Sequence, residues 1–109
     1  MSHRVTTETE MKDRELVKAA CKAQGVSFSD SAGNTIHFTG GKLQGASLDL
    51  KTGRISGDTD YGHNAKTLGA LRQAYGEAKY RFECARQGIQ IESREVDKAG
   101  NIVLICAMA

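Results

Sequence analysis

The densest group of side chains capable of chemistry lies in the heptapeptide from Asp58 to Asn64, which contains Asp58, Asp60, Tyr61 and His63. Two carboxylates and an imidazole at this spacing could ligate a metal ion or carry out acid–base catalysis. A helix beginning directly after them would add N–H groups that can receive an anion. The simpler interpretation is a solvated strand-to-helix loop, because Asp and Asn favour turns and helix N-termini. We favour that interpretation, rank ligand binding second and hydrolysis last, and expect no metal and no cofactor.

A second candidate is the glycine-rich segment from Gly40 to Gly45, in which backbone amides and Lys42 could hold a phosphate. The segment is not a Walker loop, because no Gly-Lys-Ser/Thr order precedes a helix. We therefore expect a flexible hairpin connection here. A nucleotide-like ligand, if bound, would need a pocket lined by Lys42, Arg54 and His63, or by their counterparts across a dimer.

Charge and composition exclude several classes of protein. The chain has 109 residues, 15 Lys and Arg, 13 Asp and Glu, and a formal net charge of +2. Its basic side chains are spread over several elements and interleave with glutamates, so we expect a mixed-charge surface and no nucleic-acid partner. The longest apolar run, 102–108, is far below the ~20 residues of a membrane helix. The first eight residues lack the apolar core of a secretion signal.

The three cysteines, Cys21, Cys84 and Cys106, are an odd number without Cys-x-x-Cys spacing. This pattern argues against a disulfide framework or a zinc knuckle and favours a reduced compartment, so we expect a cytoplasmic protein with cysteines in the core. His37 lies between Ile36 and Phe38 and should face away from that core.

Hydrophobic periodicity and turn signals predict the elements that position these residues. A helix should run from an Asp13 cap to about Gln24 and end at Gly25, and a longer helix should lie between Asn64 and Gly88. The longer helix should bury a stripe with steps of three and four: Leu68, Leu71, Tyr75, Ala78, Phe82 and Ala85. Strands are expected at about 3–11, 26–28, 36–38, 46–50, 55–60, 89–96 and 102–108. The last strand is apolar on both faces and should be central in its sheet.

Two stretches of the chain resemble each other. Cys21-Lys-Ala-Gln-Gly-Val26 matches Cys84-Ala-Arg-Gln-Gly-Ile89, and each is followed by an Ala-Gly-Asn turn. These matches predict one α+β domain over residues 1–109 with an internal repeat of about 3–39 and 55–108. Each repeat would be strand–helix–strand–strand. The fold would be a largely antiparallel sheet of six or seven strands with two helices on one face, which leaves the open face or the groove between the repeats for binding.

The ends of the chain resemble a known family. Met1-Ser2-His3 precedes a threonine-rich strand, and Gln87-Gly88-Ile89 and the turn from Asp97 to Gly100 precede the final apolar strand. These features are similar to the hypothetical chloroplast reading frame thirty-five family, a domain of unknown function in plastids, cyanobacteria, other bacteria and phages. His3 is the candidate ligand-binding residue that the resemblance supports.

The middle of the chain departs from that family. Members carry a Gly-aromatic-Arg-Gly stretch where this chain has Gly41 to Gly45, and a tryptophan-containing loop where it has Tyr61-Gly62-His63. The resemblance implies no settled activity and no catalytic residues. It suggests an accessory role beside ATPases of the AAA type, or, as in small phage proteins, inhibition of host machinery.

These observations together predict a non-enzymatic binding module that acts on a protein partner or associates with itself. The alternative is a small protein that binds or sequesters a nucleotide-like ligand. The least favoured hypothesis is a hydrolase that uses Asp58, Asp60 and His63.

Overall fold

The computed structural model describes residues 4–30, 33–58 and 65–108, and the chain divides into two compact units, Met1–Tyr75 and Gly76–Ala109. The helix α3 (Ala65–Arg86) contributes its first half to the first unit and its second half to the second unit. The remaining elements of the first unit are β1 (Arg4–Glu8), α1 (Arg14–Gln24), β2 (Phe28–Asp30), β3 (Thr35–Phe38), a 3₁₀ turn (Gly41–Leu43), β4 (Ser47–Asp49) and β5 (Arg54–Asp58). Those of the second unit are β6 (Ile89–Val96) and β7 (Ile102–Met108).

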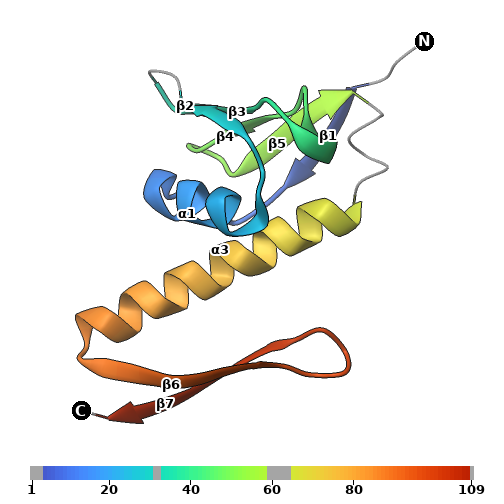
Figure 1. Cartoon of the computed structure of the whole chain (residues 1–109). Coiled ribbons are helices and arrows are strands. Elements are labelled where there is room, and N and C mark those ends of the chain that lie inside the picture. The colour runs from blue at the N-terminus through green and yellow to red at the C-terminus, as the bar shows by residue number, and fades with distance from the viewer. Residues whose placement is uncertain (1–3, 31–32, 59–64, 109) are drawn as a thin grey trace. The chain divides into compact units, whose positions relative to one another are not determined.

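The first unit is built on a five-stranded antiparallel sheet in the order β1-β5-β4-β3-β2 (Figure 1). Its register aligns Ile36, Leu48 and Ile55 across three strands, and all three side chains are fully buried. Because side chains alternate along a strand, the residues between them point to the other face. The apolar face of this sheet therefore builds the core, and α1 and the first half of α3 lie on the same side of it.

The other face of this sheet is polar and open to solvent. Its members, aligned across the strands, are Thr6, Glu8, Ser29, Thr35, His37, Ser47, Asp49, Arg54 and Ser56. His37 is exposed and its Nδ1 lies 2.9 Å from the Ser47 hydroxyl. The prediction that His37 faces away from the core is confirmed.

Local signals define both ends of α1. The Asp13 carboxylate accepts hydrogen bonds from the amides of Glu15 and Leu16 at 3.0 and 3.2 Å, which satisfies two donors that the helix leaves open. Gly25 ends the helix in the left-handed conformation, at φ +67°. The predicted bounds of this helix are confirmed.

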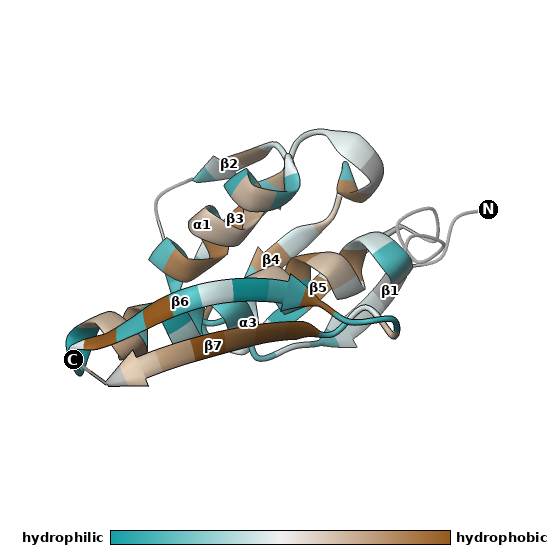
Figure 2. Cartoon of the chain, turned by 60° about the horizontal axis from the view of Figure 1, so that its bottom comes forward, coloured by the Kyte–Doolittle hydropathy of each residue, from teal (hydrophilic) through white to brown (hydrophobic). Residues whose placement is uncertain are grey.

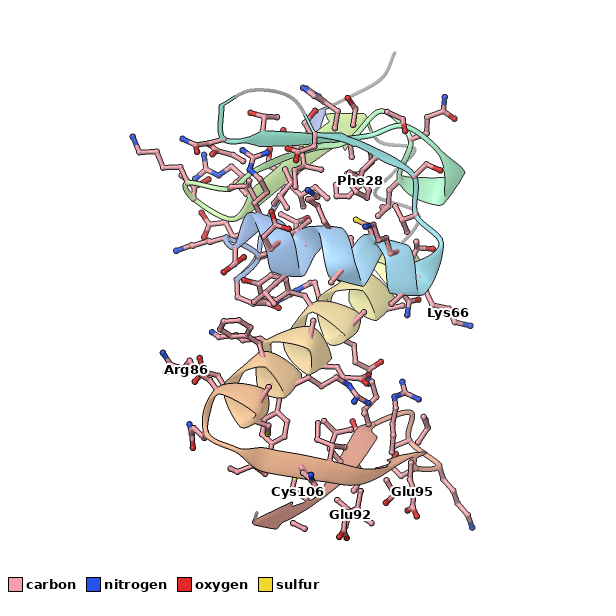
Figure 3. The ribbon with its side chains drawn as sticks, turned by 60° about the vertical axis from the view of Figure 1, so that its left-hand side comes forward. Phe28, Lys66, Arg86, Glu92, Glu95 and Cys106 are labelled. Carbon is pink, nitrogen blue, oxygen red and sulfur yellow. The ribbon has the colours of Figure 1, made fainter. Side chains whose placement is uncertain are left out.

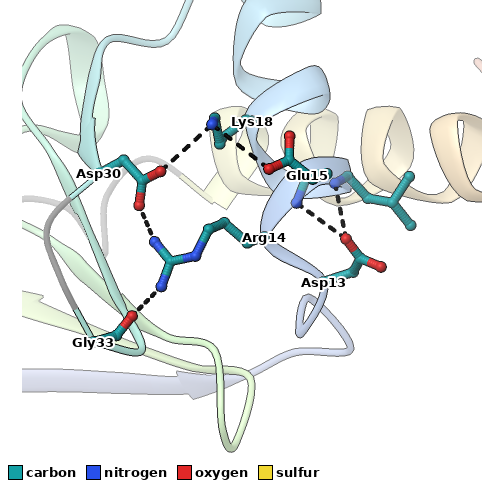
Figure 4. A network of polar contacts seen from close by, with 7 residues as sticks. Asp13, Arg14, Glu15, Lys18, Asp30 and Gly33 are labelled. Carbon is teal, nitrogen blue, oxygen red and sulfur yellow. Dashed lines mark hydrogen bonds and ion pairs between the residues drawn. The ribbon is translucent and has the colours of Figure 1, made fainter.

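An ion-pair network connects α1 to the end of β2 (Figure 4). Arg14 pairs with Asp30 and also donates to the carbonyl of Gly33. Lys18 lies 3.5 Å from Asp30 and 3.7 Å from Glu15. Phe28, half-buried at the start of the same strand, packs against the core (Figure 3). The network and this packing fix β2 against α1, although β2 itself has only three residues.

The second unit consists of the second half of α3 and the β6–β7 hairpin (Figure 1). We call it the helix–hairpin unit. The two strands pair from Ile89 opposite Met108 to Val96 opposite Ile102, with a β-bulge between Ile91 and Ser93. The Asp97 carboxylate closes the turn by accepting hydrogen bonds from the amides of Ala99 and Asn101 at 2.9 and 2.8 Å. The hydrogen bond from the Asn101 amide is the main reason that the pKa of Asp97 lies below its usual value.

The α+β class is confirmed, but the predicted single sheet of six or seven strands is not. The seven strands divide into sheets of five and two. The prediction that the last strand is central is wrong for the single chain, because β7 pairs with β6 alone among the described residues. The order strand–helix–strand–strand does occur twice, but the pseudo-repeat is not confirmed. β1 and β5, which would begin the two repeats, pair with each other, whereas β6 and β7 form a separate sheet.

Two further predictions need correction. The stripe on the long helix is buried at Leu68, Leu71 and Tyr75, but Phe82 is 58% exposed and Ala85 is exposed. The segment from Gly40 to Gly45, expected as a flexible connection, contains the 3₁₀ turn and places Leu43 in the core. An apolar side chain that must be buried thus holds this connection against the sheet.

Candidate binding surface of the helix–hairpin unit

Most of the predicted ligand-binding residues lie outside what the structure describes. His3, Asp60, Tyr61 and His63 fall outside the described residues, and of Lys42 and Asp58 only the backbone is described. The candidate site at the start of α3 therefore stays a prediction. Among the described residues, no group of three or more His, Cys, Asp or Glu side chains could hold a metal ion.

Arg54 is the one predicted ligand-binding residue whose side chain is described. Its guanidinium donates to the Glu8 carboxylate at 3.1 Å, and both side chains are more than half exposed on the open face of the five-stranded sheet. The same pattern recurs at other predicted surface cations. Arg72 pairs with Glu10 at 2.9 Å, and Arg86 with Glu83 at 3.1 Å. These pairs confirm the mixed-charge surface that the sequence predicts.

The hairpin attaches to α3 through a polar contact at its β7 strand. The Tyr80 hydroxyl lies 3.6 Å from the Cys106 sulfur. Hydrogen bonding to the Cys106 thiol, and then to the Cys84 thiol, raises the pKa of Tyr80 to about 12. Cys84 is buried and Cys106 half-buried, and both thiols are free. The side of β7 that carries Cys106 therefore faces the helix.

A second contact attaches β6 to the helix. Arg94 donates from Nε to both carboxylate oxygens of Glu77, at 3.1 and 3.0 Å, and Arg81 donates to the same carboxylate at 2.8 Å. Partial burial acts to raise the pKa of Glu77, but the hydrogen bonds and charges of the two guanidiniums outweigh it, so this pKa is lowered. Arg94 on β6 lies opposite Leu104 on β7, so these two side chains share the helix side of the hairpin.

The opposite side of the hairpin, which we call the outer face, has one polar and one apolar strand. β6 contributes Gln90, Ser93 and Glu95, which pair with Ala107, Ile105 and Val103 of β7. Val103 is 41% and Ile105 44% exposed. Figure 2 shows β7 as an almost continuous hydrophobic strand beside the more hydrophilic β6, and Figure 3 shows Glu92 and Glu95 pointing away from α3. Apolar area on the outer face is thus concentrated along β7.

Every large hydrophobic side chain that is exposed in the described part of the chain belongs to the helix–hairpin unit. These side chains are Tyr80, Phe82, Val96, Val103 and Ile105. By contrast, Cys84 is the one hydrophobic side chain between residues 76 and 107 that is buried. Exposed single hydrophobic residues are ordinary, but Val103 and Ile105 share the outer face of one apolar strand, which points to an interaction surface.

The sequence contains a signal for this surface. The uninterrupted apolar run from Ile102 to Met108 predicts a buried central strand, whereas the structure places this strand at an edge. An apolar run of this kind is typical of a strand whose two faces are both buried. The pattern does not indicate whether the residues that bury it belong to the same chain. Among the described helices, none combines the length and hydrophobicity needed to cross a membrane.

Comparison of the chain with models of known protein families, with curated proteins and with solved structures gives no match. The resemblance to the hypothetical chloroplast reading frame thirty-five family thus stays an expectation from the sequence. The function has to be argued from the residues and their arrangement.

Proposed function

We propose that this chain is a non-enzymatic binding module that acts on another polypeptide through its helix–hairpin unit. The observation that carries the proposal is the confinement of the five large hydrophobic side chains that are exposed in the described part of the chain to that unit. Fully burying a large apolar side chain is worth about 1.5–3 kcal/mol, and these side chains, which are 41–58% exposed, would each gain about half of that. A surface with several of them can therefore support association.

The polar surroundings of this surface also support a polypeptide as the ligand. The outer face joins an apolar strand to a strand that carries Gln90, Ser93 and Glu95. Apolar side chains next to hydrogen-bonding and charged groups are typical of protein–protein interfaces. The nucleotide-like alternative has less support, because Arg54, the one described side chain among its residues, is paired with Glu8.

A capture experiment with matched variants tests the proposal. Val103→Thr/Ile105→Thr removes apolar area from β7 but keeps β-branched side chains that favour a strand. The tagged chain is captured under native conditions from the cells that express it, and stoichiometric polypeptides, a second copy included, are quantified. We expect the double variant to recover at least tenfold less partner than the unmodified chain.

The matched control is Ser29→Thr, which introduces the same residue type at an exposed position in the first unit. It should leave the recovery of the partner unchanged. Equal recovery with the double variant, or no stoichiometric polypeptide with the unmodified chain, would overturn the proposal. Circular dichroism of each variant verifies that the secondary structure is retained.

A further inference from the structure

We infer that β7 pairs antiparallel with β7 of a second copy of this chain, so that two hairpins form one four-stranded sheet. The inference rests on the proposed function, because it names the polypeptide that the helix–hairpin unit binds. It goes beyond that function by specifying the strand edge, the symmetry and the register of the contact.

The free edges of the two sheets differ in how they are protected against pairing with another strand. A free edge presents unpaired backbone groups, and proteins protect it with charges, bulges or short strands. β2 has only three residues, and β1 carries exposed Thr6 and Glu8. β6 carries Glu92, Arg94 and Glu95 and contains the bulge between Ile91 and Ser93. Among the described residues these three edges are protected.

The β7 edge has none of these protections. Its seven residues, Ile102 to Met108, include no charged side chain and no proline. Its pairing with β6 has a bulge only on the β6 side, so β7 itself is a regular strand. In an antiparallel pair, successive residues direct their backbone groups alternately to the two neighbouring strands. Every second residue of β7 therefore offers its N–H and C=O to a further strand.

Both faces of β7 carry apolar side chains. Leu104 and Cys106 lie on the helix side, and Val103 and Ile105 lie on the outer face. A strand that is apolar on both faces is typical of the centre of a sheet, whereas β7 is at the edge in the single chain. Pairing with another strand would place it in the centre.

The sequence of β7 is suited to pairing with β7 of a second copy. Directly opposite residues of an antiparallel pair share a face of the sheet. Two identical strands related by a two-fold axis must therefore have one residue opposite its own counterpart. The midpoint of β7 is Ile105, and centring there pairs Val103 with Ala107 and Leu104 with Cys106. Apolar side chains meet on both faces, and no like charges oppose each other.

The small size of the helix–hairpin unit supports the same conclusion. A two-stranded hairpin is marginally stable by itself and needs further strands or a helix packed against it. Here the second half of α3 contacts the hairpin, but between residues 76 and 107 only Cys84 is buried, so the helix alone gives the unit little core. A second copy would double the number of strands and cover Ile105 by the same residue of its partner.

Charge complementation tests the pairing directly. Light scattering should give the unmodified chain twice its single-chain mass of 11.8 kDa. Ile105→Glu and Ile105→Lys should each weaken self-association at least tenfold, because each variant places two like charges opposite each other at the two-fold axis. An equimolar mixture of the two variants should recover the dimer, since the unlike charges then face each other. A variant that had merely misfolded would not be rescued in this way.

Cysteine cross-linking tests the register. Ile105→Cys should form an intermolecular disulfide on oxidation, because the two sulfurs would face each other across the axis. Val103→Cys is the matched control. Val103 lies on the same strand and the same face as Ile105 and has a similar exposure, but in the proposed dimer it would lie opposite Ala107 of the second copy. The two Val103 positions would be four residues apart along the strands, about 14 Å. This control should therefore not cross-link.

The outcomes separate this inference from the proposed function. A monomeric chain that still captures a different protein, with recovery reduced by Val103→Thr/Ile105→Thr, overturns the pairing and leaves the proposed function intact. Cross-linking of Val103→Cys in place of Ile105→Cys also overturns it, as does a dimer insensitive to both charged variants. A monomer that captures nothing overturns both.

Discussion

Arg94 of β6 donates to both carboxylate oxygens of Glu77 on α3, at 3.1 and 3.0 Å. The Glu77 side chain is only 15% exposed, whereas Arg94 and Arg81 are 45% and 43% exposed. One carboxylate thus joins the strand to the helix while its two cationic partners stay in contact with water. This contact and that of Tyr80 with Cys106 are two polar attachments of the hairpin to the helix within this unit.

Glu77→Gln should destabilise the helix–hairpin unit by about 1 kcal/mol at pH 7, since partly exposed ion pairs contribute about that much or less. The folded state lowers the pKa of Glu77, so its contribution is fully present above the unfolded value of about 4.3 and is lost as pH falls through the folded pKa. Urea unfolding of both proteins between pH 7 and pH 2.5 measures this difference.

The difference in unfolding free energy between the unmodified chain and Glu77→Gln should therefore shrink below about pH 4. Glu83→Gln, which breaks the more exposed pair with Arg86, is the control and should have the smaller effect. A difference between the unmodified chain and Glu77→Gln that stays constant over the whole pH range would contradict the assigned pairing.

Gly53→Ala should destabilise the first unit strongly, by about 2–4 kcal/mol. Gly53 has φ +77°, and a Cβ placed there would lie 2.1 Å from the Thr9 carbonyl oxygen. Gly45→Ala is the matched control, because Gly45 also has a positive φ of +91° but nothing lies within 4 Å of its added Cβ. The control should lose only about 1 kcal/mol of stability, because alanine disfavours a positive φ whereas glycine does not. Thermal and urea unfolding distinguish the two, and equal losses would refute the close approach to Thr9.

Tyr75→Phe should lower the stability of the first unit by about 1 kcal/mol. The Tyr75 hydroxyl accepts hydrogen bonds from the amides of Lys12 and Asp13 at 3.4 and 3.2 Å, and the side chain is only 3% exposed. Removing the hydroxyl leaves the amide of Asp13, the residue that caps α1, without this acceptor. Tyr80→Phe, at a half-exposed tyrosine, should destabilise less. The reverse order of stability would contradict the role of Tyr75.

The three thiols should differ in their rates of alkylation at pH 8. Burial raises the pKa of Cys21 to about 11, so its reactive thiolate is scarce and its side chain is inaccessible. Cys21 should react at least 100-fold more slowly than the half-buried Cys106. Mass spectrometry of time-resolved alkylation assigns each rate, and Cys106→Ser should remove the fast phase. Comparable rates at Cys21 and Cys106 would show that the first unit opens readily.

The sequence predicts elements whose ends are set by neighbouring residues. Asp13 and Gly25 define α1 because capping and a left-handed terminus act within one turn of helix. The hairpin from Ile89 to Met108 is also predicted, because its turn is closed locally by Asp97. Strand bounds are less accurate, and β2 begins two residues later than expected, at Phe28.

The grouping of strands into sheets could not be predicted, because it depends on contacts between distant residues. Nothing local indicates that β1 pairs with β5, or that β6 and β7 stay apart from the other five strands. The same limit explains Phe82, whose helical spacing from Tyr75 predicts burial although it is 58% exposed. Periodicity indicates which side of a helix is apolar, but it does not indicate along how much of its length other elements pack against that side. Of the candidate ligand site, only the Arg54 side chain could be compared with the structure.

The polar open face of the five-stranded sheet has a practical consequence. Its exposed residues, such as Ser29 on the short strand β2, can be replaced without disturbing the core. A fluorophore or a surface tether at Ser29 would occupy the unit that does not contain β7. The chain could thus be labelled or immobilised there without altering β7, which suits single-molecule tests of whether two copies associate.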